Sequence, residues 1–323
     1  MELFGDIITL DLLRSSIRLA TPILLAALGA VLSNRAGVFN LALEGQMLLG
    51  AFLGILSAFW LGNTYLGVLV AVASGALLGA LFTFLYLRYK VDLIILAIAL
   101  NLFISEMTIF FLRTFFSNTA TWSDPSVRQL PEIQLPFIHN LPVLGPLLSG
   151  HNAIVYFSWF ATAAIYVILF HTPFGRHVRA VGENQAAAES LGINVGRVKL
   201  FALMLGAALA ALGGAFLSVG HLTLFSRDMS NGRGFIGLTA ALFGFSHPVG
   251  ALITSLFFGF ADALSVRLQT TTNIPPSLIQ FMPHVLTILA LVAVALRSRG
   301  QEALARRRFR LRARQQLAGS AGD

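Results

Sequence analysis

The segment from Thr172 to Lys199, TPFGRHVRAVGENQAAAESLGINVGRVK, is a long polar stretch between two apolar ones. It carries the cations Arg176, Arg179, Arg197 and Lys199. Because cytoplasmic loops of membrane proteins are enriched in Lys and Arg, we expect this segment to face the cytoplasm. The orientation of the neighbouring apolar stretches follows from this loop.

The middle of this segment has the signals of a short helix. Asn184 is a residue type favoured as an N-cap, and Gln185 to Leu191 is an alanine-rich run of strong helix formers. Gly192 stands where a left-handed residue would end the helix. We predict a short helix lying flat against the membrane. It is either a structured loop without a partner or a surface on which a partner acts.

Composition places the chain among integral membrane proteins. Hydrophobic residues make up 56% and charged residues 11% of it, and the mean hydropathy is +0.79, which is outside ordinary soluble usage. The net charge of +8 arises partly from a C-terminal end that holds eight of the 22 basic residues, between Arg297 and Arg314. We interpret residues 299–323 as a basic cytoplasmic tail beside anionic lipid. An RNA-binding arm is the alternative, but no interleaved aromatic residues support it, so no nucleic-acid partner is expected.

Seven apolar runs are long enough to cross or nearly cross a bilayer. They are Ser16–Ser33, Gln46–Leu61, Leu66–Leu87, Leu93–Leu112, Ala153–Phe170, Leu200–Gly220 and Leu278–Leu296. A further run, 235–263, is interrupted at Ser246-His247-Pro248 and would form one kinked span or two short ones. We predict an all-α integral membrane bundle of about 8–10 transmembrane helices.

The basic residues orient these spans. Arg88, Lys90, the 172–199 loop and the tail should lie in the cytoplasm, which places residues 113–152 outside. Two crossings by the interrupted run then give nine spans and an outside N-terminus, whereas a crossing or re-entrant stretch near 3–13 or 37–45 would change that parity. We divide the chain into an N-terminal segment 1–14 without a signal-peptide pattern, a transmembrane domain 15–298 and the tail 299–323.

The outside segment 113–152 is polar and contains several prolines, which argues against a regular domain. It would either cap the external mouth and meet an extracytoplasmic partner or serve as a connecting loop.

The two halves of the chain can be aligned as an internal repeat. Residues 37–54, 65–87 and 93–104 correspond to residues 234–244, 248–266 and 278–292. Each half runs from a short polar-interrupted helix through a Gly/Ala-rich span to an aliphatic span. In the orientation above the halves are inverted, which is the usual construction of alternating-access transporters. Gly50-x-x-x-Gly54 and Gly75-x-x-x-Gly79 predict close helix packing.

Three carboxylates are expected at membrane depth, Glu44, Glu106 and Asp262, where a charge costs about 3 kcal/mol or more. Glu44 shares a helical face with Asn40, one turn earlier. It would cap a broken helix, pair with Arg35, or face the transported solute.

Few ionisable groups occur in the spans, so a path through them should favour a neutral polar solute and exclude phosphorylated nucleotides. The side chains expected along this substrate path are Asn40, Glu44, Gln46, Asn101 and Asn231. Asn231 opens the motif Asn-Gly-Arg-Gly-Phe, which is either a plain turn or a site for an anionic or hydroxyl-rich ligand at a helix N-terminus.

Catalytic motifs are missing from the sequence. It contains no phosphate-binding loop, no His-Glu-x-x-His and no Gly-x-Ser-x-Gly, its seven histidines are scattered, and it has no cysteine. We therefore expect no catalytic residues, no metal site and no cofactor bound by this chain. The energy for transport would come from an ion gradient or from another subunit.

Three stretches, 33–54, 178–199 and 232–264, resemble the inner-membrane permeases of the branched-chain amino acid and simple-sugar group of ABC importers. The segment GVFNLALEG at 37–45 is similar to the bacterial nucleoside branch, whose binding protein is a lipoprotein of the basic-membrane-protein type. The resemblance covers most of residues 15–298. It implies a multi-pass permease of the bacterial cytoplasmic (inner) membrane with a cytoplasmic C-terminus.

The resemblance also implies partners and residue roles. The partners would be a second permease, identical or related, two nucleotide-binding ATPase subunits that hold ATP and Mg, and an extracytoplasmic substrate-binding lipoprotein. The segment that couples to the ATPase would contain Gly182, Asn184, Ala187, Ala188, Gly192 and Ile193. Asn40, Glu44, Gly45 and Gln46 would lie near the translocation path.

The solute expected from this resemblance is a nucleoside, and a simple sugar such as ribose is the alternative. Two interpretations from other classes stay open. An ion-coupled secondary transporter would use Glu44, Glu106 or Asp262 as its coupled carboxylate and would work without an ATPase. A membrane enzyme or scaffold would need a reactive constellation that the sequence does not display.

Overall fold

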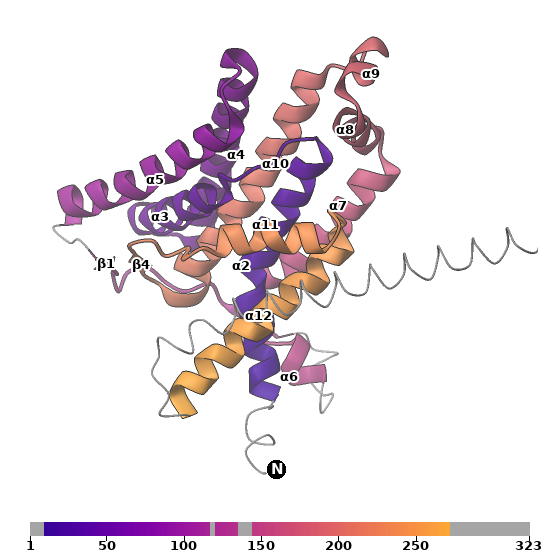
Figure 1. Ribbon diagram of the computed structural model, residues 1–323. Helices are drawn as coiled ribbons and strands as arrows, with labels where there is room; N and C mark the ends of the chain where they lie inside the picture. The colour runs from indigo at the N-terminus through magenta and orange to yellow at the C-terminus, as the bar shows by residue number, and fades with distance from the viewer. Residues whose placement is uncertain (1–9, 117–119, 135–143, 272–323) are drawn as a thin grey trace, which may run out of the picture. The chain divides into compact units, whose positions relative to one another are not determined.

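The structure is a computed structural model that describes residues 10–116, 120–134 and 144–271. Within these residues, seven helical stretches are long and apolar enough to cross a membrane (Figure 1). They are α2 (Leu10–Arg35), α3 (Leu43–Leu61), α4 (Thr64–Tyr89), α5 (Leu93–Phe116), α7 (Ala153–His171), α10 (Val195–Ala215) with its π-helical continuation η1 (Phe216–Leu222), and α12 (Pro248–Thr271). The prediction of a helical membrane protein is confirmed.

The shorter elements connect these spans. They are helices α6 (Leu144–Leu148), α8 (Pro173–Glu183), α9 (Gln185–Ser190) and α11 (Arg233–Phe243), and strands β1 (Thr121–Trp122), β2 (Glu132–Ile133), β3 (His151–Asn152) and β4 (Phe225–Ser226). β1 pairs antiparallel with β4, and β2 pairs antiparallel with β3.

Side-chain caps fix where several helices begin. The capping residues are Asn63 for α4, Asn152 for α7, Thr172 for α8, Asn184 for α9 and Asn194 for α10. Each accepts a hydrogen bond from a backbone N–H of the first turn, a donor that has no partner within the helix. This local chemistry explains why the apolar runs begin close to where the sequence predicts.

Helix α10 runs through the middle of the bundle and packs against α2, α3 and α4 (Figure 1). Glycines make this close approach possible. A Cβ placed on Gly50 would collide with the backbone of Ala211, and one on Gly79 would lie 2.6 Å from the Cβ of Ala207. The two predicted Gly-x-x-x-Gly motifs are therefore packing surfaces for α10.

The interrupted run 235–263 forms two helices, α11 and α12, separated by residues 244–247. At 11 residues, α11 is about 16 Å long, against about 30 Å of hydrocarbon. Of the two alternatives for this run, the structure has two helices, of which α11 is too short to span the hydrocarbon by itself. The number of crossings, and with it the count of nine spans, stays a prediction.

Other predictions fall partly outside the described residues. These include the run Leu278–Leu296, the tail 299–323 and the third member of the second half of the repeat. The inverted repeat and the total of about 8–10 helices therefore stay predictions. Helix α2 begins at Leu10, so its first turn lies inside the segment 1–14 that we had separated from the transmembrane domain.

The described parts of segment 113–152 fold against the bundle. The indole of Trp122 packs on the rings of Phe116 and Phe59, with centroid distances of 4.4 and 5.3 Å. Val127 and Leu130 are buried among the same core residues. Residues 120–134 therefore form short strands and turns that fold against the bundle, whereas a role of the segment as an external cap stays a prediction.

Candidate translocation and coupling site

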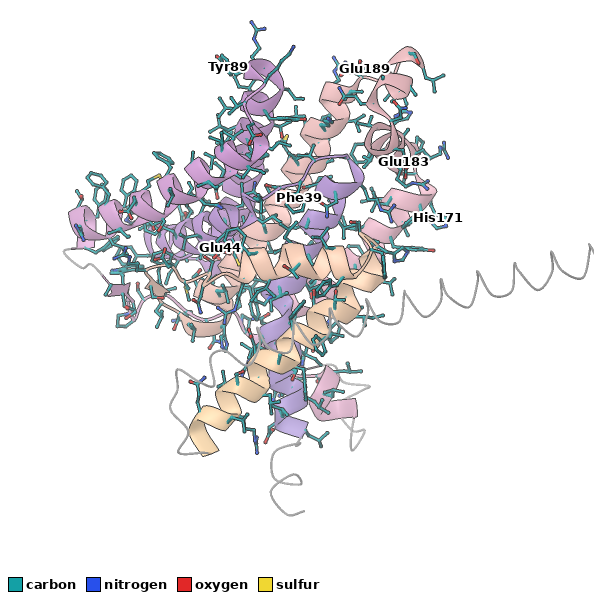
Figure 2. All side chains as sticks on the ribbon, in the orientation of Figure 1. Phe39, Glu44, Tyr89, His171, Glu183 and Glu189 are labelled. Carbon is teal, nitrogen blue, oxygen red and sulfur yellow. The ribbon has the colours of Figure 1, made fainter. Side chains whose placement is uncertain are left out.

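Glu44, in the first turn of α3, caps the N-terminus of the half-length helix α11 (Figure 2). Its Oε1 accepts a hydrogen bond from the backbone N–H of Gly232, and its Oε2 accepts one from Gly234, both at 2.8 Å. The first N–H groups of a helix have no partner within the helix, and the helix dipole favours an anion there. The interpretation of Glu44 as the cap of a broken helix is confirmed.

Arg35, the last residue of α2, contacts the other end of the same helix. Its Nε donates to the carbonyl oxygen of Ser246 at 2.7 Å and its Nη2 to that of Phe245 at 3.2 Å. The helix dipole is negative at the C-terminal end, so it favours a cation there, just as its positive N-terminal end favours the carboxylate of Glu44. The two residues that flank the linker between α2 and α3 thus hold α11 at both ends, and the alternative pairing of Glu44 with Arg35 is wrong.

Asn101 and Ser105 on α5 extend this polar region. The Asn101 side chain accepts from the N–H of Gly45 at 2.9 Å and donates to the carbonyl of Leu41 at 3.0 Å. One turn further along, Ser105 donates to a carboxylate oxygen of Asp228 at 2.7 Å. α5 is thereby tied both to the linker and to the loop that precedes α11.

Asn231 belongs to that same loop. It is exposed, has a φ of 45°, and directly precedes Gly232, whose N–H is bonded to Glu44. Three of the predicted substrate-path residues, Glu44, Asn101 and Asn231, are therefore gathered around the start of α11. Their role in binding a solute stays a prediction.

Asn40 and Gln46 do not present themselves to a solute in this conformation. Both are fully buried, and the Nδ2 of Asn40 lies 3.3 Å from the Oε1 of Gln46. Asn40 also accepts from the N–H of Ala42 at 3.0 Å. The prediction that Asn40 and Gln46 contact the solute directly therefore needs correction. Their buried side chains instead stabilise the conformation of the linker.

Sequence reasoning missed Ser105 and Asp228 as members of the site. They are 123 positions apart, and no periodicity connects them. Of the other carboxylates, Glu106 is exposed on α5 and forms no ion pair within the described chain, whereas Asp262 is half-buried in α12.

The predicted coupling segment forms two helices, α8 and α9. The Oδ1 of Asn184 accepts from the N–H of Ala187 at 3.0 Å, so Asn184 is the N-cap as predicted. Gly192 has a φ of 79°, and its N–H bonds to the carbonyl of Glu189 at 2.9 Å. The N–H of Ile193 reaches the carbonyl of Ala188 at 3.1 Å, which completes a Schellman end. α8 was not predicted as a helix.

The side of α9 that faces outward differs from our expectation. Ala188 is only 2% exposed and packs in the core, whereas Ala186 and Ala187 are exposed and Leu191 is 80% exposed. As part of the coupling segment, Ala188 was expected on the surface on which a partner acts; it instead seats the helix on the core. The exposed surface of α9 is formed by Ala186 and Ala187 together with its polar residues, and Leu191 follows at the C-cap.

Two contacts fasten this segment to the rest of the chain. Lys199 on α10 is 3% exposed, donates to the Oε1 of Gln185 at 2.8 Å, and lies 5.5 Å from the ring centroid of Tyr86. At the end of α8, Gly182 abuts the backbone carbonyl of Arg35, and a Cβ there would lie 3.1 Å from the nitrogen of Gly37. The coupling segment therefore touches the linker that holds α11.

These features define a class of protein. Several helices are long enough to span a membrane, and a half-length helix with a polar N-terminal environment packs against two of them. A capped helix pair on the surface contacts the linker between those two. This is the construction of a membrane transport permease.

The comparisons with known proteins give the family. The chain belongs to the family described as the permease component of branched-chain amino acid transport systems, whose model matches residues 12–291. It is the permease subunit of an ABC importer, a class that works with ATPase and binding-protein partners and is not itself an enzyme.

Curated relatives cover most of the chain. The guanosine ABC transporter permease protein NupQ of Bacillus subtilis is 34% identical over 284 residues, which are 84% of this chain and 88% of the relative. The nucleoside ABC transporter permease protein NupC of Lactococcus lactis is 32% identical over the same shares of the two chains. The putative glucose ABC transporter permease protein TsgC13 of Haloferax volcanii is 32% identical over 80% of this chain and 78% of its own. No solved structure matches the chain.

Proposed function

We propose that this permease imports a nucleoside, and that the solute passes the polar region around the N-terminus of α11. The observation that carries the proposal is that the carboxylates of this region are already bonded. Glu44 accepts from two backbone N–H groups, and Asp228 accepts from Ser105 and lies 3.5 Å from Arg227. Because these carboxylates already have partners, the region offers no free anion, which suits a neutral solute with many hydroxyl and ring-nitrogen groups.

Aromatic side chains beside this region support a nucleoside more than a sugar. Phe39 in the linker is 42% exposed, and Phe235 in the first turn of α11 is 43% exposed. An exposed ring can stack on a nucleobase, whereas a sugar alone offers no flat aromatic face. Relatives named as guanosine and nucleoside permeases agree with this choice. A sugar stays the second candidate, because TsgC13 is named as a glucose permease.

The partners follow from the class. The exposed surface of α9 would dock on an ATPase subunit, which binds ATP and Mg. A second permease, identical or related, would complete the pore, and an extracytoplasmic lipoprotein would deliver the solute. The large apolar side chains exposed on α4 and α5 suit lipid or that second permease, among them Leu69, Leu77, Ile95 and Leu102.

In the bacterial cytoplasmic membrane, α8 and α9 would lie on the cytoplasmic side with the C-terminus, and residues 113–152 would lie outside. ATP-driven closure of the ATPase subunits would displace α8 and α9. That motion would reach α11 through Arg35 and Glu44, which flank the linker between α2 and α3 and contact the two ends of α11. The movement of α11 would then open the path to the opposite side of the membrane.

The test is uptake of labelled uridine, guanosine and ribose by cells that carry the whole transporter, with and without this chain. We expect loss of the chain to abolish nucleoside uptake and to leave ribose uptake unchanged. Phe39→Ala and Phe235→Ala should each raise the KM for the nucleoside several-fold, because stacking contributes about 0.5–1.5 kcal/mol. Phe103→Ala, an exposed ring on α5, is the matched control.

Two outcomes would contradict the proposal. Loss of ribose uptake with nucleoside uptake intact would make the chain a sugar permease. Nucleoside uptake by this chain without any ATPase subunit would favour an ion-coupled secondary transporter instead.

A further inference from the structure

The turn between α11 and α12 has an unfavourable backbone. Phe245 and Ser246 are consecutive non-glycine residues with φ of 55° and 48°. Side chains of L-residues disfavour this region, and a bulky residue such as Phe is seldom found there. Burial does not compensate, since Phe245 is 77% exposed. Some other part of the protein must hold the turn in this shape.

Contacts from the end of α2 stabilise it. The guanidinium of Arg35 donates to the carbonyl oxygens of both Phe245 and Ser246, at 3.2 and 2.7 Å. The neighbouring Asn34 side chain lies 3.3 Å from the Oγ of Ser246. Hydrogen bonds from a charged donor are stronger than neutral ones, so Arg35 is the main support of this turn.

The backbone of Arg35 is contacted from the opposite direction by α8. Its carbonyl oxygen lies so close to Gly182 that a Cβ at position 182 would collide with it. Gly37 repeats this tight fit, since a Cβ there would lie 3.2 Å from the Cα of Gly182. With no side chain between them, a displacement of the end of α8 must move Arg35.

Space for such a movement lies beside the turn. A polar cavity of about 310 Å³ is bordered by Arg35, Arg179, Glu183 and Ser246, among others. The guanidinium of Arg179 lies 5.2 Å from the ring centroid of Phe170, and its buried Nε has no hydrogen-bond partner in the described part of the chain.

We propose that Arg35 is a positioning residue that transmits the displacement of α8 and α9 to the turn at residues 244–247, and thereby to α11. Gly182 of α8 would displace the backbone of Arg35, and the hydrogen bonds of the guanidinium would move the turn together with it. Glu44 would meanwhile keep the N-terminal end of α11 in place. The inference rests on the proposed docking of α9 on the ATPase. It goes beyond that docking by naming the side chain through which coupling passes.

The first test uses Arg35→Gln in the complete complex, reconstituted in liposomes. We expect uptake and substrate-stimulated ATP hydrolysis to fall at least tenfold, while subunit assembly and basal ATP hydrolysis stay unchanged. Uptake and stimulated ATP hydrolysis in Arg35→Lys should lie between those of the unchanged protein and those of Arg35→Gln. An ammonium keeps the charge but lacks the planar fork that reaches two carbonyl groups. Full coupling in Arg35→Gln would overturn the proposal.

The second test replaces the hydrogen bonds between Arg35 and the turn by a covalent link between the end of α2 and the turn. The chain has no cysteine, so Asn34→Cys with Ser246→Cys introduces a single pair, to be bridged by a short bis-methanethiosulfonate reagent. Bridging should leave uptake intact when Arg35 is present and should restore it in Arg35→Gln, and thiol reductant should reverse that rescue. If the bridge blocks uptake with Arg35 present, the turn must separate from α2 during transport and the proposal is wrong.

Failure of the proposed docking is recognised separately. Ala187→Arg places a charge on the exposed side of α9 without touching Arg35 or the turn. If Ala187→Arg leaves stimulation intact, α9 is not the docking surface. If it abolishes stimulation while Arg35→Gln does not, docking stands and the relay through Arg35 is refuted.

Discussion

Glu44 shows how a carboxylate becomes acceptable at membrane depth. Both of its oxygens accept hydrogen bonds from backbone N–H groups, and it stands at the positive end of a helix dipole. The charge is therefore part of the fold, and it need not face an ion or a charged solute. The two hydrogen bonds of Glu44 favour an ATP-driven permease for neutral solutes over an ion-coupled transporter more clearly than the composition of the chain does.

The first prediction concerns this cap. Glu44→Gln keeps one oxygen acceptor and leaves either Gly232 or Gly234 with an unsatisfied N–H, which should cost about 1–3 kcal/mol. We expect a lower unfolding temperature in detergent and reduced uptake. Glu106→Gln is the control, because the exposed Glu106 makes no hydrogen bond within the described chain. Equal unfolding temperatures for the two variants would show that the cap contributes nothing.

His151, in β3, gives the protein a dependence on pH. Burial lowers the pKa of its imidazole below the ordinary value of 6.5; the hydrogen bond to the Leu147 carbonyl opposes this, Arg14 and Arg18 lower the pKa further, and Glu132 has the smallest, raising effect. The unfolded chain therefore binds this proton more readily than the folded one. Stability from the neutral ring is complete above about pH 6.5 and is lost as the pH falls toward the folded-state pKa.

The second prediction follows from that sign. The unfolding temperature should fall between about pH 7.5 and pH 5.5. The decrease should be smaller in His151→Gln, because Gln can still donate to the Leu147 carbonyl without taking up a proton. His177→Gln, at an exposed histidine of α8, should keep the full decrease. A decrease of the same size in His151→Gln would assign the effect to other groups.

At the scale of elements, α9 is a six-residue helix with one side seated on the core and one side free. Ala188 supplies the seated side, and Ala187 and Leu191 lie on the free side. Substitutions on the two sides should therefore have different consequences, although the residues are neighbours in the chain.

The third prediction uses this contrast. Ala187→Arg should leave the unfolding temperature unchanged and abolish substrate-stimulated ATP hydrolysis in the complex. Ala188→Arg buries a charge and overpacks the core, so it should lower the unfolding temperature as well. Thermal unfolding and ATPase assays on both variants make the comparison. Equal losses of stability would mean that α9 has no free side.

At the scale of the whole molecule, the positive residues of the α8–α9 segment and the cap at residues 113–152 should lie on opposite sides of the membrane. The absence of cysteine makes this measurable with single substitutions. Ser190→Cys at the end of α9 and Ser126→Cys in the cap both introduce an exposed thiol.

The fourth prediction is that a membrane-impermeant maleimide labels Ser126→Cys in intact cells and labels Ser190→Cys only after the membrane is opened. A thiol-reactive reagent that crosses membranes should label both, which controls for reactivity. Labelling of both from the same side would overturn the orientation and, with it, the cytoplasmic docking of α9.

The sequence by itself determined the class of the protein, the position of most spans and the capped helix α9, because hydropathy and capping are local properties. The tertiary structure decided which residues meet. Glu44 caps α11 across 188 and 190 positions of sequence, and Arg35 reaches the turn across 210 and 211. It also decided that Ala188 faces inward, since six residues are too few for periodicity to distinguish the two sides of a helix. Burial of Asn40 and Gln46, like these contacts, depends on helices that are remote in sequence and close only in the folded bundle.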